Sequence, residues 1–493
     1  MTQTHIAASG DERALRFVIV GAGVAGILSA IKLMQAGHRD IVLLEKAPRL
    51  GGTWRDNTYP GVACDIPSHF YCYSFAPNPQ WSQQYSPGHE IQAYLERVAA
   101  DHQVTQRIRF GEEVSDCVFS DGQWQLRTHS GHRTSADVVI AATGVTHHPS
   151  VPALPGLDSF AGASFHSARW NHDVPLDGRR VGVIGTGSSA VQIVSALVSR
   201  VAALSLFQRT PQWIMPMENK RYSDDDRAKF GSDPAVMRAM RAAIERRFIE
   251  NFSDAVVDAD SPRLKVMEDL CRENLEKQVL DPVLRERLRP DHRVACKRLV
   301  VSPDFYQAIQ HPNARLVTES ITGIEAAGVR TGDQVLHPLD VLVLATGFRT
   351  NQFMRPMRIV GQAGQCLDDV WGGRPMAYLT VAVPGFPNLF MLNGPCSPVG
   401  NFPLIEAAEL QMGYVLQLIE VLRSGRCRTI SPTLADTAQF NADRELAARK
   451  TVWTTGCRSW YLDEAGVPAA WPWTIARFRA ELAQPRLAAY DLA

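Results

Sequence analysis

The sequence predicts an α/β fold with two interleaved Rossmann-like dinucleotide-binding domains and a helical insertion. Two glycine-rich motifs predict it, Gly21-x-Gly23-x-x-Gly26 and Gly185-x-Gly187-x-x-Ala190, because each lies between an apolar strand and a helix. The third observation is an Ala-Thr-Gly triplet that follows a buried type of strand twice, at 142–144 and at 345–347. This repeat is typical of a chain that crosses between two nucleotide domains. Two dinucleotides in one chain are what hydride transfer from a nicotinamide to a flavin requires.

Composition excludes several classes of function. With 493 residues the chain is long enough for two or three domains with sizeable cores. Lys+Arg and Asp+Glu are equal at 51 each, so no basic field predicts a nucleic-acid partner. The N-terminus, Met1 to Arg16, has no apolar signal core. Polar residues interrupt the most apolar long run, Val181 to Val198, so we expect no transmembrane segment.

Nine cysteines are spread from Cys64 to Cys457 without a C-x-x-C pair. The odd count and the spacing favour free, mostly buried thiols in a reducing, cytoplasmic protein. We therefore expect no metal site and no disulfide framework.

The first βαβ unit is clear from its pattern. Its expected parts, in order, are the strand 17–20, the turn 21–26, the helix 27–36, the strand 41–44 and the acid Glu45. Gly21 permits the tight turn, Gly23 lets a pyrophosphate approach the backbone, and Gly26 lets the helix pack on the strand. The helix N-terminus favours phosphates. Glu45 lies where a ribose-binding acid belongs, which favours FAD or NAD over NADP.

The second unit differs at the end of its second strand. We expect a strand at 181–184, a helix at 188–200 and a second strand at 204–207. No acid follows the last strand, and Arg209 and Thr210 stand there instead. A guanidinium and a hydroxyl suit a 2′-phosphate, so the pattern favours NADPH. The alternative is that Arg209 is a solvated charge at a strand end.

The segment 222–295 has dense charges and helical spacing. Two apolar stripes predict amphipathic helices: Met237, Met240, Ile244 and Phe248, and then Leu264, Met267, Leu270 and Leu275. We expect the stripes to pack on a neighbouring domain, although an insertion can also supply cavity walls. The expected domains are 13–146 (FAD, first part), 150–221 (NADP, first part), 222–295 (insertion), 296–347 (NADP, second part) and 348–493 (FAD, second part).

Further motifs show a family resemblance. Gly51-Gly52-x-Trp54, Tyr59-Pro60-Gly61 and Asp65 follow the first unit, and the segment between the units contains Phe160-x-Gly162-x-x-x-His166-x-x-x-Trp170. This combination resembles the class B flavoprotein monooxygenases, in particular the Baeyer–Villiger monooxygenases. Asn171 departs from the fingerprint, in which Pro or Asp follows the tryptophan. Relatives that oxidise amine nitrogen or sulfur generally have Tyr or Phe in place of Trp170.

The resemblance implies two sets of cofactor contacts. FAD would contact Gly21, Gly23, Gly26, Glu45, Thr53, Trp54, Arg55, Asp56, Asp65, Tyr71 and Val114. NADP would contact Gly185, Thr186, Gly187, Ser188, Ser189, Ala190, Gln192, Arg209, Thr210 and Lys297.

The resemblance also implies a catalytic pair. Without it, Lys297-Arg298 would be interpreted as charges on the surface. With it, Arg298 is the catalytic cation and Asp65 its partner. A guanidinium stays charged at any working pH and can stabilise a flavin peroxide anion and the oxyanion of its ketone adduct. His166 is expected to couple domains, without a role in proton transfer.

The implied activity is an NADPH- and O2-dependent FAD monooxygenase that inserts one oxygen next to a ketone carbonyl, giving an ester or lactone. Two alternatives stay open: an N- or S-oxygenating flavin monooxygenase, and an NADPH–flavin reductase without oxygenation. The sequence specifies neither the ketone nor the oligomeric state. For Trp460 and Tyr461 we expect core packing in preference to contact with the ketone.

Overall fold

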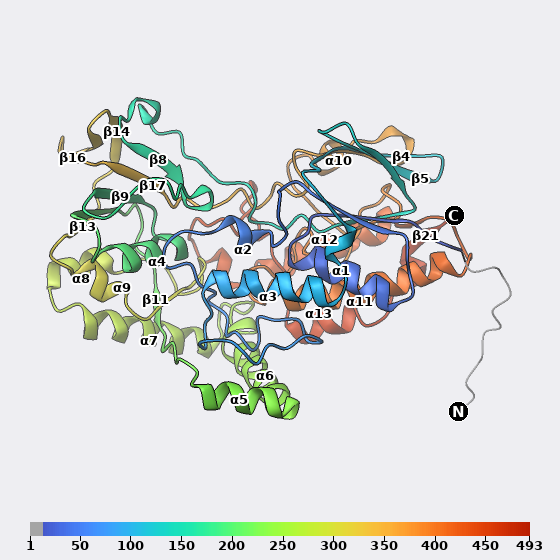
Figure 1. Cartoon of the computed structure of the whole chain (residues 1–493), viewed down its shortest axis with the longest axis horizontal. Coiled ribbons are helices and arrows are strands. Elements are labelled where there is room, and N and C mark those ends of the chain that lie inside the picture. The colour runs from blue at the N-terminus through green and yellow to red at the C-terminus, as the bar shows by residue number, and fades with distance from the viewer. Residues whose placement is uncertain (1–12) are drawn as a thin grey trace.

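The computed structural model describes residues 13–493, so most of the polar stretch Met1 to Arg16 lies outside the described residues. A five-stranded parallel sheet forms the core of the first domain (Figure 1). Its strands, in spatial order, are β19 (Leu389–Met391), β7 (Val138–Ala141), β1 (Phe17–Val20), β2 (Ile41–Glu45) and β3 (Ile108–Phe110). Its strands β1 and β7 are buried along their whole length, as runs of Val and Ile predict for a parallel sheet.

A second five-stranded parallel sheet lies at the other end of the long axis (Figure 1). Its order is β13 (Ala314–Val317), β10 (Ala203–Phe207), β9 (Arg180–Ile184), β17 (Val341–Leu344) and β8 (Ala163–His166). All of these strands lie in the chain between β7 and β19 of the first sheet. The two sheets are therefore interleaved, and the predicted fold class is confirmed.

Smaller sheets surround the two cores. They are β18–β4–β5–β6 (Arg358–Val360, Val114–Ser120, Gln123–Thr128, Arg133–Ala136), β14–β15–β16 (Ile321–Glu325, Gly328–Thr331, Leu336–Pro338), β11–β12 (Ile214–Pro216, Val300–Ser302) and β20–β21 (Ile430–Pro432, Tyr490–Leu492).

Helices cover the sheets. Those of the first domain are α1 (Val24–Gln35), α2 (Thr53–Asp56), α3 (Gly88–Asp101), α10 (Leu367–Trp371), α11 (Leu404–Arg423), α12 (Leu434–Ala448) and α13 (Ile475–Glu481). Helices α1 and α11 pack together, and so do α4 (Ser188–Leu197) and α9 (Phe305–Ile309) of the second domain. None of the helices in residues 13–493 is long and apolar enough to cross a membrane.

The first helix begins earlier than predicted. We expected it from Ile27, and it begins at Val24 because the Ile27 N–H already donates to the Gly23 carbonyl at 3.0 Å. The last residues of the glycine motif therefore form the first turn of α1. Helix α4 ends at Leu197, three residues before the predicted end. The domain limits stay predictions.

The insertion forms the helices expected of it, and the first two of them extend below the two domains in Figure 1. They are α5 (Asp224–Ser232), α6 (Pro234–Phe248), a π-helical turn (Ile249–Ser253), α7 (Pro262–Gln278) and α8 (Pro282–Leu288). Met237, Leu264 and Leu275 are buried, as predicted. Arg241 of α6 forms an ion pair with Glu406 of α11. It also donates to the Cys72 carbonyl at 3.0 Å, so the insertion is tied to the first domain.

The expectation of free thiols is wrong for one pair. Cys296 and Cys457, 161 residues apart, form a disulfide with Cα atoms 6.2 Å apart. Sequence spacing could not show this, because only the fold brings these segments together. The other seven cysteines are free thiols, and all but the half-buried Cys366 are buried.

We predict that Gly26→Ala destabilises the protein by about 1–3 kcal/mol, the range for an overpacked core. A Cβ at Gly26 would lie 1.9 Å from the Gly21 carbonyl oxygen, so the backbone itself must move. Thermal unfolding would measure the change.

The matched control is Gly413→Ala. Gly413 is an exposed position of α11 where a Cβ would meet nothing within 4 Å. The Gly413→Ala substitution should leave the stability of the protein unchanged or raise it slightly, because alanine favours the helical conformation. Equal melting temperatures for Gly26→Ala and the parent would contradict the packing argument.

Candidate functional site

Two cavities lie at the predicted nucleotide motifs. The smaller, about 170 Å³, runs along the first glycine motif. Nine of the eleven residues predicted to contact FAD line it: Gly21, Gly23, Glu45, Thr53, Trp54, Arg55, Asp56, Tyr71 and Val114. Gly26 lies behind it, in the contact between helix and strand, and Asp65 lines the other cavity.

Backbone packing leaves this cradle open. Gly23 and Gly52 approach so closely that a Cβ on Gly52 would lie 3.1 Å from the Gly23 Cα, and both line the cavity. Side chains here would fill the space next to the N-terminus of α1. Buried Asn393 also lines the cavity, and its Oδ1 has no hydrogen-bond partner within the described residues. Free backbone at a helix N-terminus and an unpaired acceptor fit a dinucleotide.

Glu45 is fixed at the end of β2. Its Oε2 accepts from the Ala22 N–H at 2.8 Å, and its Oε1 accepts from the Ala47 N–H at 3.0 Å and from Arg55 at 2.9 Å. Arg55 also pairs with Asp56 at 2.9 Å. A carboxylate has about four acceptor positions, so Glu45 can still accept from a ribose hydroxyl.

Thr53, Trp54 and Tyr71 line both cavities. The Trp54 indole N–H donates to the Tyr71 hydroxyl oxygen at 3.2 Å, which fixes the two rings edge to face. The two cavities therefore meet at this wall. A dinucleotide held along the first motif would reach the larger cavity at this point.

The larger cavity, about 1560 Å³, contains the second motif. Its lining includes Gly185, Thr186, Gly187, Ser188, Ser189, Gln192, Arg209, Thr210 and Lys297. Ala190 is fully buried and lies inside the helix packing. The Thr186 hydroxyl donates to the Thr210 carbonyl at 2.8 Å, which joins the two ends of the predicted phosphate site.

Gln192 contacts the first domain. Its Oε1 accepts from the Tyr59 hydroxyl at 2.9 Å, and its amide donates to the Ala63 carbonyl at 3.0 Å. A Cβ on Gly61 would lie 2.6 Å from the Gln192 carbonyl oxygen. The Tyr-Pro-Gly motif is therefore part of the contact between the two domains.

Lys297 and Arg209 lie close enough for their charges to interact. Burial lowers the pKa of Lys297 first, and the positive charge of Arg209 lowers it further, against the raising effect of Asp291. Two neighbouring cations that line one cavity repel each other unless an anion lies between them. This arrangement suits a doubly charged phosphate.

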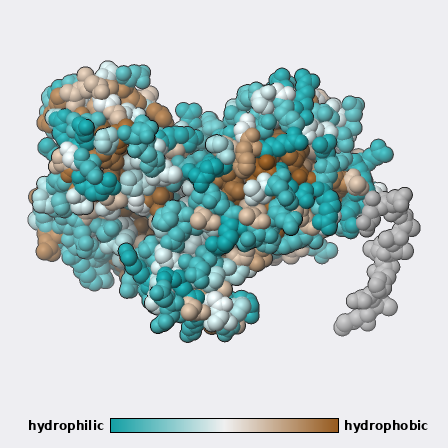
Figure 2. Space-filling view, in the orientation of Figure 1, coloured by the Kyte–Doolittle hydropathy of each residue, from teal (hydrophilic) through white to brown (hydrophobic). Residues whose placement is uncertain are grey.

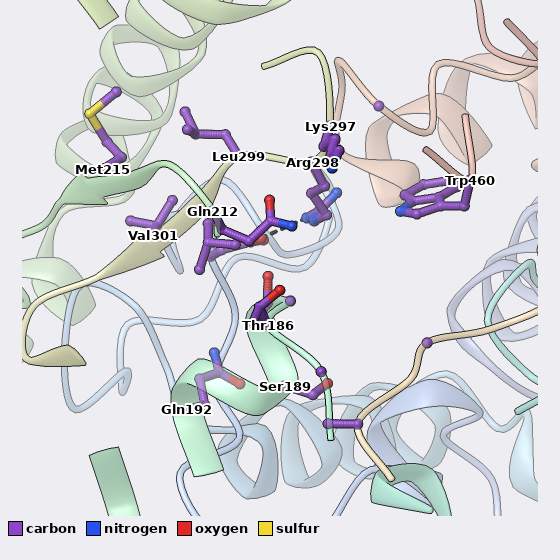
Figure 3. A pocket seen from close by; sticks show the side chains of 18 of the residues that line it. Thr186, Ser189, Gln192, Gln212, Met215, Lys297, Arg298, Leu299, Val301 and Trp460 are labelled. Atoms are coloured by element: carbon purple, nitrogen blue, oxygen red, sulfur yellow. Dashed lines mark hydrogen bonds and ion pairs between the residues drawn. The ribbon is translucent and has the colours of Figure 1, made fainter. Parts of the chain in front are cut away.

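Arg298 and Asp65 form an ion pair, with Nη2 and Oδ2 2.6 Å apart. The charge of Asp65 raises the pKa of Arg298 against the effect of burial, so the guanidinium stays protonated. Its side chain is 40% exposed and lines the cavity. In Figure 3, Lys297 and Arg298 lie above Thr186 and Ser189 of the second motif, and Trp460 lies to the right of Arg298.

The fingerprint residues lie behind the cavity. His166 ends β8; its Nδ1 accepts from the Ala168 N–H at 3.1 Å, and its Nε2 lies 3.1 Å from the Gly347 carbonyl. The first contact assigns the proton to Nε2, which then donates to Gly347. Burial lowers the pKa of His166, in keeping with a neutral ring. His166 thus holds the second crossing of the chain.

The rest of the fingerprint packs around this point. A Cβ on Gly162 would lie 2.3 Å from the Asp340 carbonyl oxygen. Phe160 packs against a buried apolar cluster of the second domain. Trp170 contacts Phe165 edge to face, with ring centroids 4.9 Å apart.

Sequence reasoning missed the apolar wall of the larger cavity. Ile244, Phe248, Phe252, Val266, Met267 and Leu270 of the insertion line it. The helical stripes contained four of these residues, but we assigned those stripes to core packing. Val266 and Leu270 are 50% and 45% exposed, and Trp460, at 39%, lines the same space. The wall includes Phe252 of the π-helical turn, and such turns are frequent at functional sites.

The surface around the cavity is mainly hydrophilic. Figure 2 shows polar residues over most of the visible face, with apolar areas at the upper left and in the middle of the right-hand domain.

Comparisons with known proteins agree with this geometry. The family model for flavin-binding monooxygenase-like proteins matches residues 14–357. An uncharacterised monooxygenase of Mycobacterium tuberculosis is 48% identical over 96% of this chain and 95% of its own length. A Baeyer–Villiger monooxygenase of Streptomyces coelicolor is 38% identical over 97% of this chain and 92% of its own.

Solved structures show the same fold. Cyclohexanone monooxygenase of Rhodococcus sp. Phi1 bound to NADP+ is 29% identical with a TM-score of 0.87, covering 97% of this chain and 99% of that one. A complex of OTEMO with FAD and NADP is 25% identical, also with a TM-score of 0.87, covering 98% and 100%. The chain therefore belongs to the flavin-binding monooxygenase-like family, as an enzyme of the Baeyer–Villiger type whose cofactors are FAD and NADPH.

Proposed function

We propose that this enzyme uses NADPH and O2 to insert one oxygen atom next to the carbonyl of an apolar ketone, giving an ester or a lactone. The observation that carries the proposal is the Arg298–Asp65 pair, which lines the larger cavity; this cavity holds the second nucleotide motif and meets the smaller cavity of the first motif at Thr53, Trp54 and Tyr71. When bound, FAD would supply the redox and oxygen-activating chemistry.

Arg298 has the properties that oxygen insertion requires. Negative charge develops on oxygen atoms during attack on a carbonyl, and a fixed guanidinium can stabilise that charge. Arg298 is charged at any working pH, faces the cavity and is oriented by Asp65. In this proposal Arg298 is the catalytic residue, and Asp65 holds it in place.

The cavity supports an apolar substrate. Six of the nine residues of the insertion that line it are apolar, and Met215, Leu299 and Val301 extend the same wall (Figure 3). Such a wall excludes water from the reacting atoms. Lys297 and Arg209 would bind the 2′-phosphate of NADPH, and Glu45 a ribose of FAD. Seven of the nine cysteines are free thiols, as in a cytoplasmic protein, whereas the Cys296–Cys457 disulfide is of a kind that is rare in that compartment.

We predict that Arg209→Ala and Lys297→Ala each raise the KM for NADPH far more than the KM for NADH. A lost contact between a charge and a phosphate costs on the order of 1.5–3 kcal/mol, or roughly 10- to 150-fold. Steady-state kinetics with both coenzymes would measure this. Arg200→Ala is the control, since Arg200 is exposed and pairs with Asp177 away from the cavity. Equal changes for both coenzymes would rule out the 2′-phosphate contact.

We also predict that Arg298→Ala separates flavin reduction from oxygenation. The variant should still bind FAD and be reduced by NADPH. Ester formation should fall by roughly 10²- to 10³-fold, as when a donor to a developing oxyanion is removed, and oxygen uptake should release hydrogen peroxide. Arg298→Lys should also form little ester, because an ammonium group lacks the planar arrangement of N–H donors that a guanidinium has.

Rapid-mixing absorbance would follow reduction, and mass spectrometry would identify products from a panel of ketones and thioethers. Arg247→Ala is the control, because Arg247 lines the same cavity without a predicted role. Conversion of a good ketone by Arg298→Ala at the parent's rate would refute the catalytic assignment. A parent enzyme that oxidises only thioethers would favour the S-oxygenating alternative.

A further inference from the structure

The C-terminal segment 456–461 meets the loop of Arg298 at two points. The first is the disulfide between Cys457 and Cys296, two residues before Arg298. The second is Tyr461: burial raises the pKa of its hydroxyl, and the nearby guanidinium of Arg298 opposes that rise, so the two groups lie close together. Each contact joins the last part of the chain to the same three-residue stretch. Sequence patterns reveal neither contact.

Tyr461 is buried behind Arg298 and does not line the cavity. It is 2% exposed, and neighbouring Trp460 and Arg458 line the cavity instead. Its ring packs between Trp453 and Trp460, with centroid distances of 5.4 and 4.2 Å. A Cβ on Gly400 would lie 2.7 Å from that ring, so the absence of a side chain at Gly400 makes room for it.

The segment is itself anchored. The Val452 N–H donates to the Val256 carbonyl of the insertion at 3.1 Å, and the Ala469 N–H donates to the Tyr461 carbonyl at 2.7 Å. Cys296, Leu299, Trp453, Cys457 and Tyr461 belong to one buried apolar cluster. A rigid support of this kind can hold a charged side chain in one orientation.

A guanidinium has five N–H donors, and a single carboxylate contact leaves it free to turn. Asp65 accepts from Nη2 of Arg298. Tyr461, which comes from a different part of the chain, supplies a second oxygen. Two oxygen partners from separate segments define the plane of the fork.

We propose that segment 456–461 is a positioning element for Arg298, in which Tyr461 orients the guanidinium and the Cys296–Cys457 disulfide fixes the backbone that carries it. Tyr461 is a positioning residue, since it acts through Arg298 and does not face the cavity. The inference rests on the catalytic role proposed above for Arg298.

The test is Tyr461→Phe, which removes one oxygen and keeps the ring packing. We expect flavin reduction by NADPH within about twofold of the parent and a several-fold loss of oxygenated product per NADPH, with matching release of hydrogen peroxide. The control is Tyr414→Phe, which removes a buried phenol oxygen that contacts Tyr490 away from both cavities. A merely structural role would lower the melting temperature and leave the product yield per NADPH unchanged, which would overturn the proposal.

A double-mutant cycle tests whether Tyr461 acts through Arg298. In an Arg298→Ala background, Tyr461→Phe should cause no further loss of product. Fully additive losses would contradict a shared role. Cys457→Ser should lower the yield in the same direction, and an unchanged yield would remove the disulfide from the proposal. Cys427→Ser, which removes a buried free thiol elsewhere, is its control.

A crystal structure of Tyr461→Phe gives a readout that does not need the reaction. We expect the guanidinium to turn away from its position in the parent, and an unmoved side chain would refute the positioning role. Product yield can be scored as ester or as sulfoxide. Failure of the ketone proposal would therefore appear in the parent enzyme, whereas failure of this inference would appear in the comparison of variant with parent.

Discussion

The ion pair between Arg298 and Asp65 is the contact on which the arrangement of the site depends. Asp65 follows the Tyr-Pro-Gly motif of the first domain, and Arg298 returns from the insertion, 233 residues later. A charged group lining an apolar cavity is stable only with a partner. The pair therefore forms only when the first domain, the insertion and the second domain hold fixed positions relative to one another. It also leaves the positive charge beside the wall where both cavities meet.

The two crossings of the chain make this register possible. Gly347 follows β17 at the second crossing, and its carbonyl accepts from the Ser150 N–H at 2.8 Å as well as contacting His166. The first and second crossings are therefore held together at one carbonyl. A few backbone contacts thus fix distant parts of the chain, and His166 adds a side-chain contact at the same carbonyl.

Local patterns explain why most of the fold could be predicted. Runs such as Val-Val-Ile at β7 and the glycine spacing before α1 specify structure over a few residues. The pairing of Arg298 with Asp65 could be predicted only through a family resemblance, since Lys297-Arg298 alone does not differ from surface charges. The disulfide and the contact of Tyr461 with Arg298 join residues more than 160 positions apart. The apolar wall was misjudged because a helical stripe has the same spacing whether it faces a core or a cavity.

The contact of Gly61 with α4 has a consequence for motion. Backbone meets backbone there, without side chains that could change rotamer as the domains turn. The hydrogen bonds of Gln192 to Tyr59 and Ala63 surround the same point. A rotation of one domain relative to the other would thus have its pivot near residue 61. The opening would be smallest beside Asp65 and would widen with distance from it, so the Arg298–Asp65 pair would move little.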